Sequence, residues 1–178
     1  TPDEVQLELA GNTKLFFVSE KPTMVWLSAT SNKNDFYYND YYVAGISSID
    51  LNDHEHVYLF TQPGAVTGIT ISKADKVKTL ELTRIPALTK LELKDAKLLR
   101  SLDLTKQAEL TYLDFQGAEE LTSIDLSANT KLKRIFINDT KLSSLDLSKH
   151  MALQHINIER NQLTSLKISS SVQSIWAY

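Results

Sequence analysis

The sequence predicts a mainly β protein: a right-handed solenoid with two parallel sheets of short strands, preceded by a small β subdomain. Three observations support this fold class. A short apolar phrase recurs at near-constant spacing over residues 66–178, and this phrase occurs in two alternating kinds. Residues 1–65 lack that spacing but contain strand-like runs separated by turns. The Gln62-Pro63-Gly64 turn is the predicted junction between the two parts.

The first 65 residues are predicted to form an all-β cap that covers the apolar edge of the first coil. Turn-prone stretches (AGN, EKP and SNKN) separate runs that have the composition of strands. These runs are VQLEL (5–9), KLFFV (14–18), TMVWL (23–27) and HVYLFT (56–61). No Gly/Ser-rich linker follows them, so we expect the cap and the solenoid to form one rigid body.

The stretch DFYYNDYYVAG (35–45) is unusually aromatic, with five rings within seven residues: Phe36, Tyr37, Tyr38, Tyr41 and Tyr42. One interpretation is an aromatic loop that stacks on sugar rings or inserts into a partner, which makes these residues a secondary binding candidate. The other is that the rings close the core of the cap. If the stretch is a strand, one Tyr of each adjacent pair must point outward.

The repeat is the phrase apolar-x-x-apolar-x-apolar, in which the fifth residue is usually polar. Alternation of this kind is typical of a strand with one buried face. The steps between phrases are 11 residues six times, then 10, 11, 10 and 9. The phrases start at Val66, Val77, Leu88, Leu99, Leu110, Leu121, Leu132, Leu142, Leu153, Leu163 and Val172.

The phrases alternate in kind, so the true period is 21–22 residues and holds two strands. Phrases starting at 77, 99, 121, 142 and 163 read LEL, LDL, IDL, LDL and LKI, each followed by Thr or Ser. Phrases starting at 88, 110, 132, 153 and 172 read LEL, LDF, IFI, INI and IWA, without that tail. One such unit cannot fold alone, because about six buried side chains at roughly 2 kcal/mol each do not offset ordering some 21 residues at roughly 1–2 kcal/mol each. We therefore expect about five coils that stack on one another.

The stretch LQHINIERNQL (153–163) fits the pattern LxxLxLxxNxL, and the chain therefore resembles leucine-rich repeat proteins. The nested half-periods resemble a bacterial class of these repeats called IRREKO, of the surface or secreted type. The Asn position departs from the family pattern, because Asn161 is replaced by Thr140, Ala118 and Ala96 in earlier coils. Asn129 occupies the equivalent place in the other half of a coil.

The outward positions of the second kind of phrase change from coil to coil. The third positions read Lys90, Tyr112, Arg134, His155 and Ser174, and the fifth read Glu92, Asp114, Phe136, Asn157 and Trp176. Tyr, Trp and Arg carry much of the energy of protein interfaces. We predict a ligand-binding face formed by Tyr112, Asp114, Arg134, Phe136, His155, Asn157 and Trp176. The alternative is that Tyr112 is an isolated surface ring and Trp176 belongs to a C-terminal cap.

The Leu-Asp-Leu phrases have a monotonous outer face, with Asp103, Asp125 and Asp146 in one column beside Ser and Thr. A cation site is conceivable there, but a solvated face with local hydrogen bonds is the better interpretation. DHEH (53–56) places His54 and His56 on one side of a strand, which is a weak zinc signal. We therefore predict no metal and no cofactor.

Composition and motifs exclude several functions. The net charge is −3, with no basic stripe for nucleic acid, and no apolar run is long enough for a transmembrane segment. The absence of cysteine excludes disulfides, thiolate metal sites and a Cys nucleophile. The GxSxG, HExxH and P-loop motifs are absent, so we do not expect an enzyme.

The leading functional hypothesis is a recognition or adhesion module that binds a protein or carbohydrate ligand through the changing face. The resemblance implies an extracellular or bacterial cell-surface location. The chain starts at Thr1 without Met, so we expect that a signal segment has been removed. The alternative is the targeting domain of a secreted effector whose catalytic part lies outside this chain. The oligomeric state is left open.

Overall fold

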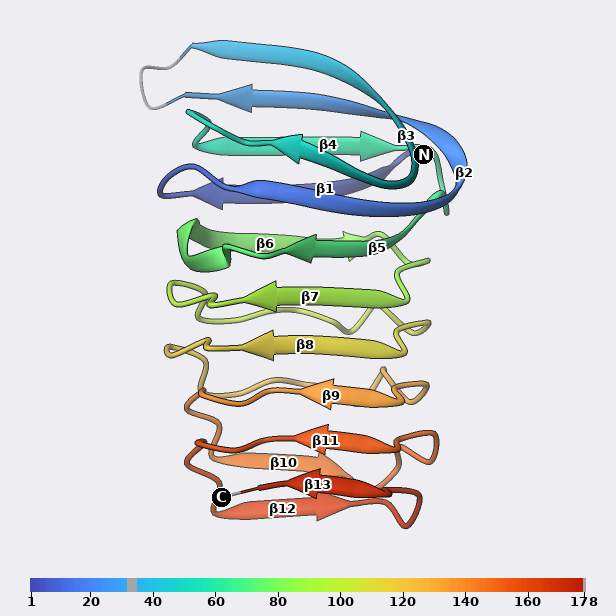
Figure 1. Cartoon of the computed structure of the whole chain (residues 1–178), viewed down its shortest axis with the longest axis vertical. Coiled ribbons are helices and arrows are strands. Elements are labelled where there is room, and N and C mark those ends of the chain that lie inside the picture. Colours follow the sequence, from blue (N-terminus) through green and yellow to red (C-terminus); the bar gives the residue numbers. More distant parts are fainter. Residues whose placement is uncertain (32–34, 178) are drawn as a thin grey trace.

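The computed structural model describes residues 1–31 and 35–177 and has the predicted mainly β architecture. The chain forms a β-solenoid of about five turns with parallel sheets (Figure 1). Within the described residues there is no α-helix, and the only helical element is the 3-10 turn η1 (Ala74–Lys76). The turn-prone SNKN stretch falls partly on residues 32–34, outside the described residues.

The first wall of the solenoid is a parallel sheet built from the second kind of phrase. Each strand pairs with the equivalent strand one coil away, as the 21–22-residue period predicts. The strands are β5 (Val66–Ile71), β7 (Lys90–Lys94), β8 (Tyr112–Gln116), β9 (Arg134–Phe136), β11 (His155–Asn157) and β13 (Ser174–Trp176).

The second wall holds the Leu-Asp-Leu phrases and is less regular than predicted. It begins with β6 (Val77–Arg84) and ends with β10 (Ser144–Leu147) paired in parallel with β12 (Ser165–Ile168). The phrases that start at Leu99 and Leu121 were expected to be strands, but residues 101–104 and 121–126 are not in a strand ladder. Leu102, Leu104 and Leu126 in these segments are still buried. The segments therefore keep the apolar spacing of the repeat although they form no strand pairing.

Four N-terminal strands continue both walls without a break in the hydrogen-bonded sheet. They are β1 (Asp3–Leu9), β2 (Lys14–Thr30), β3 (Phe36–Asp50) and β4 (His56–Thr61). The first half of β2 pairs with β5 of the first wall, and its second half pairs with β4. β4 pairs with β1, and β1 pairs with β6 of the second wall. A division near residue 65 into cap and solenoid stays a prediction.

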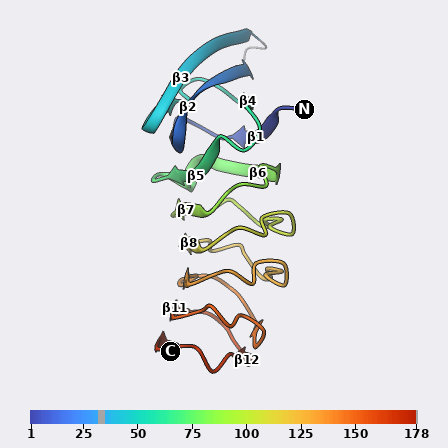
Figure 2. The same ribbon diagram turned by 90° about the vertical axis from the view of Figure 1, so that its right-hand side faces the viewer.

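Two N-terminal predictions are wrong in detail. The runs at 14–18 and 23–27 form the single strand β2, whose register with β3 shifts between Ser19 and Thr23. The EKP stretch therefore bends a continuous strand from one wall to the other and does not end it. The aromatic stretch near residue 40 is also a strand, β3, and not a loop. β2 and β3 together close the top of the molecule (Figures 1 and 2).

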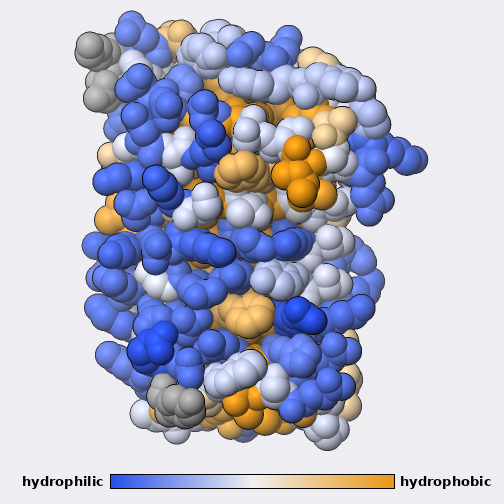
Figure 3. Space-filling view, viewed as in Figure 1, coloured by the Kyte–Doolittle hydropathy of each residue, from blue (hydrophilic) through white to orange (hydrophobic). Residues whose placement is uncertain are grey.

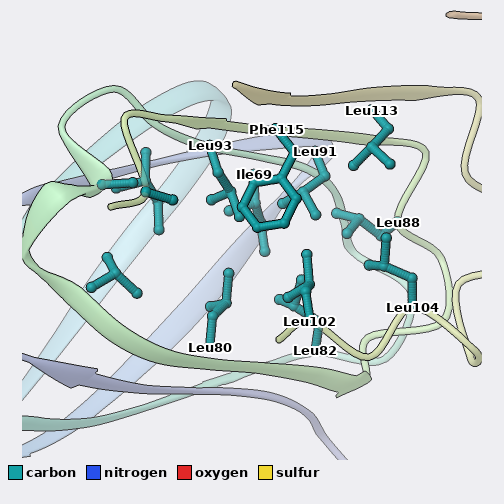
Figure 4. Close-up of a cluster of buried hydrophobic side chains, with 14 of the residues drawn as sticks. Ile69, Leu80, Leu82, Leu88, Leu91, Leu93, Leu102, Leu104, Leu113 and Phe115 are labelled. Atoms are coloured by element: carbon teal, nitrogen blue, oxygen red, sulfur yellow. The ribbon is translucent and has the colours of Figure 1, made fainter. Parts of the chain in front are cut away.

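The core lies between the two walls and runs the length of the molecule. Ile69, Leu91 and Leu113 on the first wall point toward Leu80 and other leucines of the second wall (Figure 4). Phe17 and Phe115 are among the largest side chains that are fully buried. Because neighbouring coils share this apolar core, each coil is stabilised by the coils on either side.

Buried polar side chains tie successive coils together at one corner. The Asn129 amide Nδ2 donates to the carbonyl oxygens of Leu104 (3.0 Å) and Gln107 (2.9 Å) in the preceding coil. Gln107 Nε2 donates to carbonyls of the coil before that, and His150 Nε2 lies 2.8 Å from the Leu126 carbonyl oxygen. These side chains satisfy backbone carbonyl oxygens in the segments where the chain turns from one wall to the other.

The opposite corner contains left-handed backbone at equivalent places in successive coils. The φ angles are 58° at Asp95, 71° at Gly117, 59° at Asp139 and 53° at Arg160. Each of these residues directly precedes the Asn position of the repeat pattern, which carries Ala96, Ala118, Thr140 and Asn161 in successive coils. In the last of these coils the Asn161 amide donates to the Ile137 carbonyl at 2.7 Å. The tight turn therefore recurs even where the coil carries Ala and not Asn.

Candidate functional site

The variable face consists of the outward side chains of β7, β8, β9, β11 and β13. Strand pairing aligns them in the two predicted columns, one running from Lys90 to Ser174 and the other from Glu92 to Trp176. The seven predicted binding residues therefore lie on one face. Their role in binding stays a prediction.

The centre of the variable face is a pair of aromatic rings from neighbouring coils. The Tyr112 and Phe136 ring centroids are 5.8 Å apart with an interplanar angle of 46°. The Lys90 ammonium lies 5.0 Å from the centre of the Tyr112 ring and also forms a 2.9 Å ion pair with Glu92. Both rings are half-buried, so each presents part of its surface to solvent.

Charged groups beside the rings differ in how well they are paired. Arg134 is exposed, and its guanidinium makes no ion pair with any described residue. Asp114 is buried and accepts a 2.8 Å hydrogen bond from Gln116 Nε2. Burial raises the pKa of the Asp114 carboxyl above its ordinary value, although the Gln116 bond opposes the shift. Burial also raises the pKa of the Tyr112 hydroxyl above its ordinary value.

The lower part of the face is more polar. His155 Nδ1 lies 2.7 Å from the hydroxyl oxygen of Ser174 in the next coil. Asn157 Oδ1 accepts a 3.2 Å hydrogen bond from the backbone N–H of Glu159. Trp176 is 44% exposed, so it offers ring surface at the end of its column. Asn157 therefore has a local structural role, whereas Trp176 has a large free surface.

The variable face extends further than the sequence indicated. Residues of β2 and β3 continue the two columns: Val18 is opposite Gly68 and Ile46, and Phe16 is opposite Thr70. Ile46 is 77% exposed. The surface of the molecule seen in Figure 3 has an upper apolar area and a lower apolar area, and a hydrophilic band separates them. The signal for the upper area was the run Phe16-Phe17-Val18, because three consecutive apolar residues in a strand cannot all face the core.

The secondary candidate residues are divided between two faces of β3. Phe36, Tyr38 and Tyr42 point outward, where they are 73%, 71% and 68% exposed. Tyr41 packs against the core, and the Tyr37 ring lies 4.7 Å from the His54 ring. One Tyr of each adjacent pair therefore points outward, as expected for a strand. The outward rings lie on the side of the second wall and are not part of the variable face.

The Asp column has local hydrogen bonds in each coil. Asp103, Asp125 and Asp146 each accept bonds from the hydroxyl and the backbone N–H of the residue two positions later. The hydroxyl bond lowers the pKa of each carboxyl below its usual value, and the backbone bond adds to this. No group of three or more His, Asp or Glu side chains in the described parts of the chain is placed to hold a metal ion.

The hollows described on the surface lie away from the variable face. Four hollows with volumes of about 230 to 700 Å³ are lined by residues outside this face. The hollow of about 700 Å³ lies beside the second wall, between Gln6 on β1 and the segment that contains Leu98. Small-molecule sites are usually concave. None of these four hollows therefore places a concave site on the variable face.

No described helix is long and apolar enough to cross a lipid bilayer. Comparisons with protein families, curated proteins and solved structures give no match to this chain.

Proposed function

We propose that the chain is a non-enzymatic recognition or adhesion module that binds a protein or a glycan through the variable face. The observation that carries this proposal is the Tyr112–Phe136 ring pair beside the unpaired Arg134. Phe136 points outward from a strand whose neighbours Ile135 and Ile137 fill the core, so the core itself does not require a ring at this position. Rings stack on sugars or on peptide side chains, and a free guanidinium pairs with carboxylates of either ligand class.

The repeat pattern supports the biological setting of this proposal. The nested phrases resemble bacterial leucine-rich repeats of the surface or secreted type, so we place the protein outside the cell or at its surface. A solenoid of this kind presents a rigid surface whose outer residues vary without disturbing the core. The alternative, a targeting domain for a catalytic part outside this chain, would use the same face and differs only in what is attached.

The test compares two triple variants on an array of glycans and extracellular proteins. The first variant, Tyr112→Ala/Arg134→Ala/Phe136→Ala, removes the centre of the variable face. The matched control, Ser101→Ala/Ser123→Ala/Ser144→Ala, changes three exposed residues at equivalent third positions on the second wall. Circular dichroism verifies that both variants fold.

We expect the wild type and the serine control to bind the same ligand and the aromatic variant to lose at least about tenfold in affinity. Equal binding by all three proteins would contradict the proposal and redirect attention to the outward rings of β3. If the serine control alone loses binding, the ligand contacts the second wall. The chemical class of the array hits separates a glycan from a protein ligand.

A further inference from the structure

The strand β3 forms an open edge of the sheet. It pairs along its length with β2, and no strand among the described residues lies on its other side. Both ribbon views place it at the outer end of the molecule (Figures 1 and 2). An unpaired edge presents a row of N–H and C=O groups that can pair with another strand. Soluble proteins usually block such edges with Lys, Pro or very short strands.

This edge lacks those blocking features. From Phe36 to Asp50 the strand has 15 residues, no Lys, no Arg and no Pro, and its charges are Asp40 and Asp50. Its outward rings, Phe36, Tyr38 and Tyr42, are each more than two-thirds exposed. The segment 36–42, which we call the edge segment, therefore combines free backbone groups with large exposed rings.

The hydrogen bonds next to the edge segment show which of its backbone groups are directed outward from the sheet. The Ser31 N–H donates to the Asp35 carbonyl, so the odd-numbered residues of β3 in this region face β2. The Asp40 N–H donates to Asn39 Oδ1 at 2.9 Å and not to β2. Phe36, Tyr38, Asp40 and Tyr42 thus direct their backbone groups toward the free edge.

The edge segment, FYYNDYY, is nearly symmetric about Asn39. In an antiparallel pairing of two copies centred there, Phe36 lies opposite Tyr42, Tyr37 opposite Tyr41, and Tyr38 opposite Asp40. Opposed residues of an antiparallel pair point to the same side, so rings meet rings on both faces of the extended sheet. A register shifted by two residues in one direction places Asp40 opposite Asp40, which is unfavourable because the charges repel. The opposite shift breaks both ring pairs, leaves Tyr38 opposite Tyr38 as the one pair of rings within this segment, and places Phe36 opposite Asp40.

We propose that a second copy of this chain pairs with the edge segment and forms a symmetric dimer whose two-fold axis passes between the two Asn39 residues. Backbone groups of Phe36 and Tyr38 in each copy bond to Tyr42 and Asp40 of the other. The Asp40 N–H exchanges its Asn39 bond for the Tyr38 carbonyl across the axis. The same surface is used on both subunits, so the assembly closes at two copies. The edge segment lies on the side of the second wall, so this dimer does not use the variable face.

The first test is the mass in solution by sedimentation equilibrium. We expect the wild type to have twice the 20.1 kDa mass of the chain. Tyr38→Pro removes an N–H that is directed to the free edge and leaves the pairing of β3 with β2 possible, so it should yield a monomer. Tyr58→Ala is the matched control, because it removes a 39% exposed ring from β4 without changing the edge, and it should stay a dimer.

The second test fixes the register and does not depend on a disruptive variant. The chain has no cysteine, so a single introduced thiol reports one contact. In the proposed register the two Asn39 residues form a non-hydrogen-bonded pair with Cα atoms about 4.5 Å apart, which is within the range for a disulfide. Asn39→Cys should therefore cross-link into a dimer on mild oxidation, and Tyr41→Cys should not.

A wild type that is monomeric throughout a concentration series would overturn the proposal, as would a Tyr38→Pro protein that remains dimeric and folded. Cross-linking at position 41 and not at position 39 would overturn the proposed register. Circular dichroism of each variant separates loss of pairing from loss of folding.

Discussion

Gly117 lies directly against the backbone of Asp95 in the preceding coil. A Cβ atom on Gly117 would be 3.0 Å from Asp95 Oδ1 and 3.2 Å from Asp95 Cα, and the Gly117 φ angle is +71°. The left-handed corner of this coil therefore depends on glycine for two reasons: its conformation and its close approach to a neighbour.

Gly117→Ala should destabilise the protein by about 2–3 kcal/mol, because it adds a steric conflict to the roughly 1–2 kcal/mol cost of a left-handed non-glycine residue. Gly64→Ala is the matched control, since Gly64 has φ +72° and no atom within 4 Å of a built Cβ. Urea unfolding of both variants gives the difference. Equal losses would mean that the contact with Asp95 relaxes without cost.

Asn129→Leu should destabilise the protein by about 2 kcal/mol, because two hydrogen bonds to buried carbonyls are lost, at about 1 kcal/mol each. The affected oxygens belong to Leu104 and Gln107. The control is Gln154→Leu, which changes an exposed amide and should alter the free energy of unfolding by less than about 0.5 kcal/mol. A loss no larger than that of the control would show that the two Asn129 hydrogen bonds contribute nothing net to stability.

His150→Asn should change stability by less than about 1 kcal/mol, whereas His150→Leu should cost about 1–2 kcal/mol. His150 holds the place that Asn129 holds one coil earlier, and its Nε2 bonds to the Leu126 carbonyl. An Asn amide can make the same bond, but Leu cannot. Denaturant midpoints give the stability of the two variants. If the Leu variant were the more stable, apolar packing and not the hydrogen bond would set the stability at position 150.

Asp114→Asn should raise the urea midpoint at pH 7, because the buried Asp114 carboxylate is less stable than it would be in the unfolded chain. The raised pKa means that Asp114 favours the folded state below its ordinary pKa of about 3.9 and that this advantage is lost as the pH rises through the folded value. The gain from Asn should therefore shrink as the pH falls toward 4.

Asp125→Asn should change the urea midpoint at pH 7 in the opposite direction. The Ser127 hydroxyl lowers the pKa of Asp125, so its contribution is present above about pH 3.9 and is lost as the pH falls through the lower folded value. This variant should lower the midpoint at pH 7 and match the wild type in acid. If the two variants changed the urea midpoint in the same direction at pH 7, burial of the Asp114 carboxylate would not be destabilising as proposed here.

The sequence was sufficient to predict the first wall and the two columns of the variable face. Alternation is unambiguous there: Ile135 is buried between Arg134 and Phe136, so the outward residues follow directly. The 21–22-residue period then aligns them across coils. Neither step requires knowledge of long-range contacts beyond the repeat itself.

The N-terminal strands could not be predicted as well, because long-range pairing overrides local signals. The EKP stretch has the composition of a turn, yet pairing with β3 on both sides of it keeps β2 continuous. Three outward positions in the first half of β3 are aromatic (Phe36, Tyr38 and Tyr42), so this half lacks the polar and apolar alternation that identifies a strand. The row of buried polar side chains that joins the coils at one corner could not be predicted from a repeated letter. Its members Gln107, Asn129 and His150 are different residue types, and each bonds to a carbonyl of the preceding coil.

The stacking of coils has a mechanical consequence. The sheet hydrogen bonds join one coil to the next and therefore lie along the long axis of the molecule (Figure 1). Tension applied along this axis opens the contacts between coils one after another, because each coil contacts only its neighbours. The protein should therefore lengthen in small successive steps at low force. It should not resist until all contacts break together.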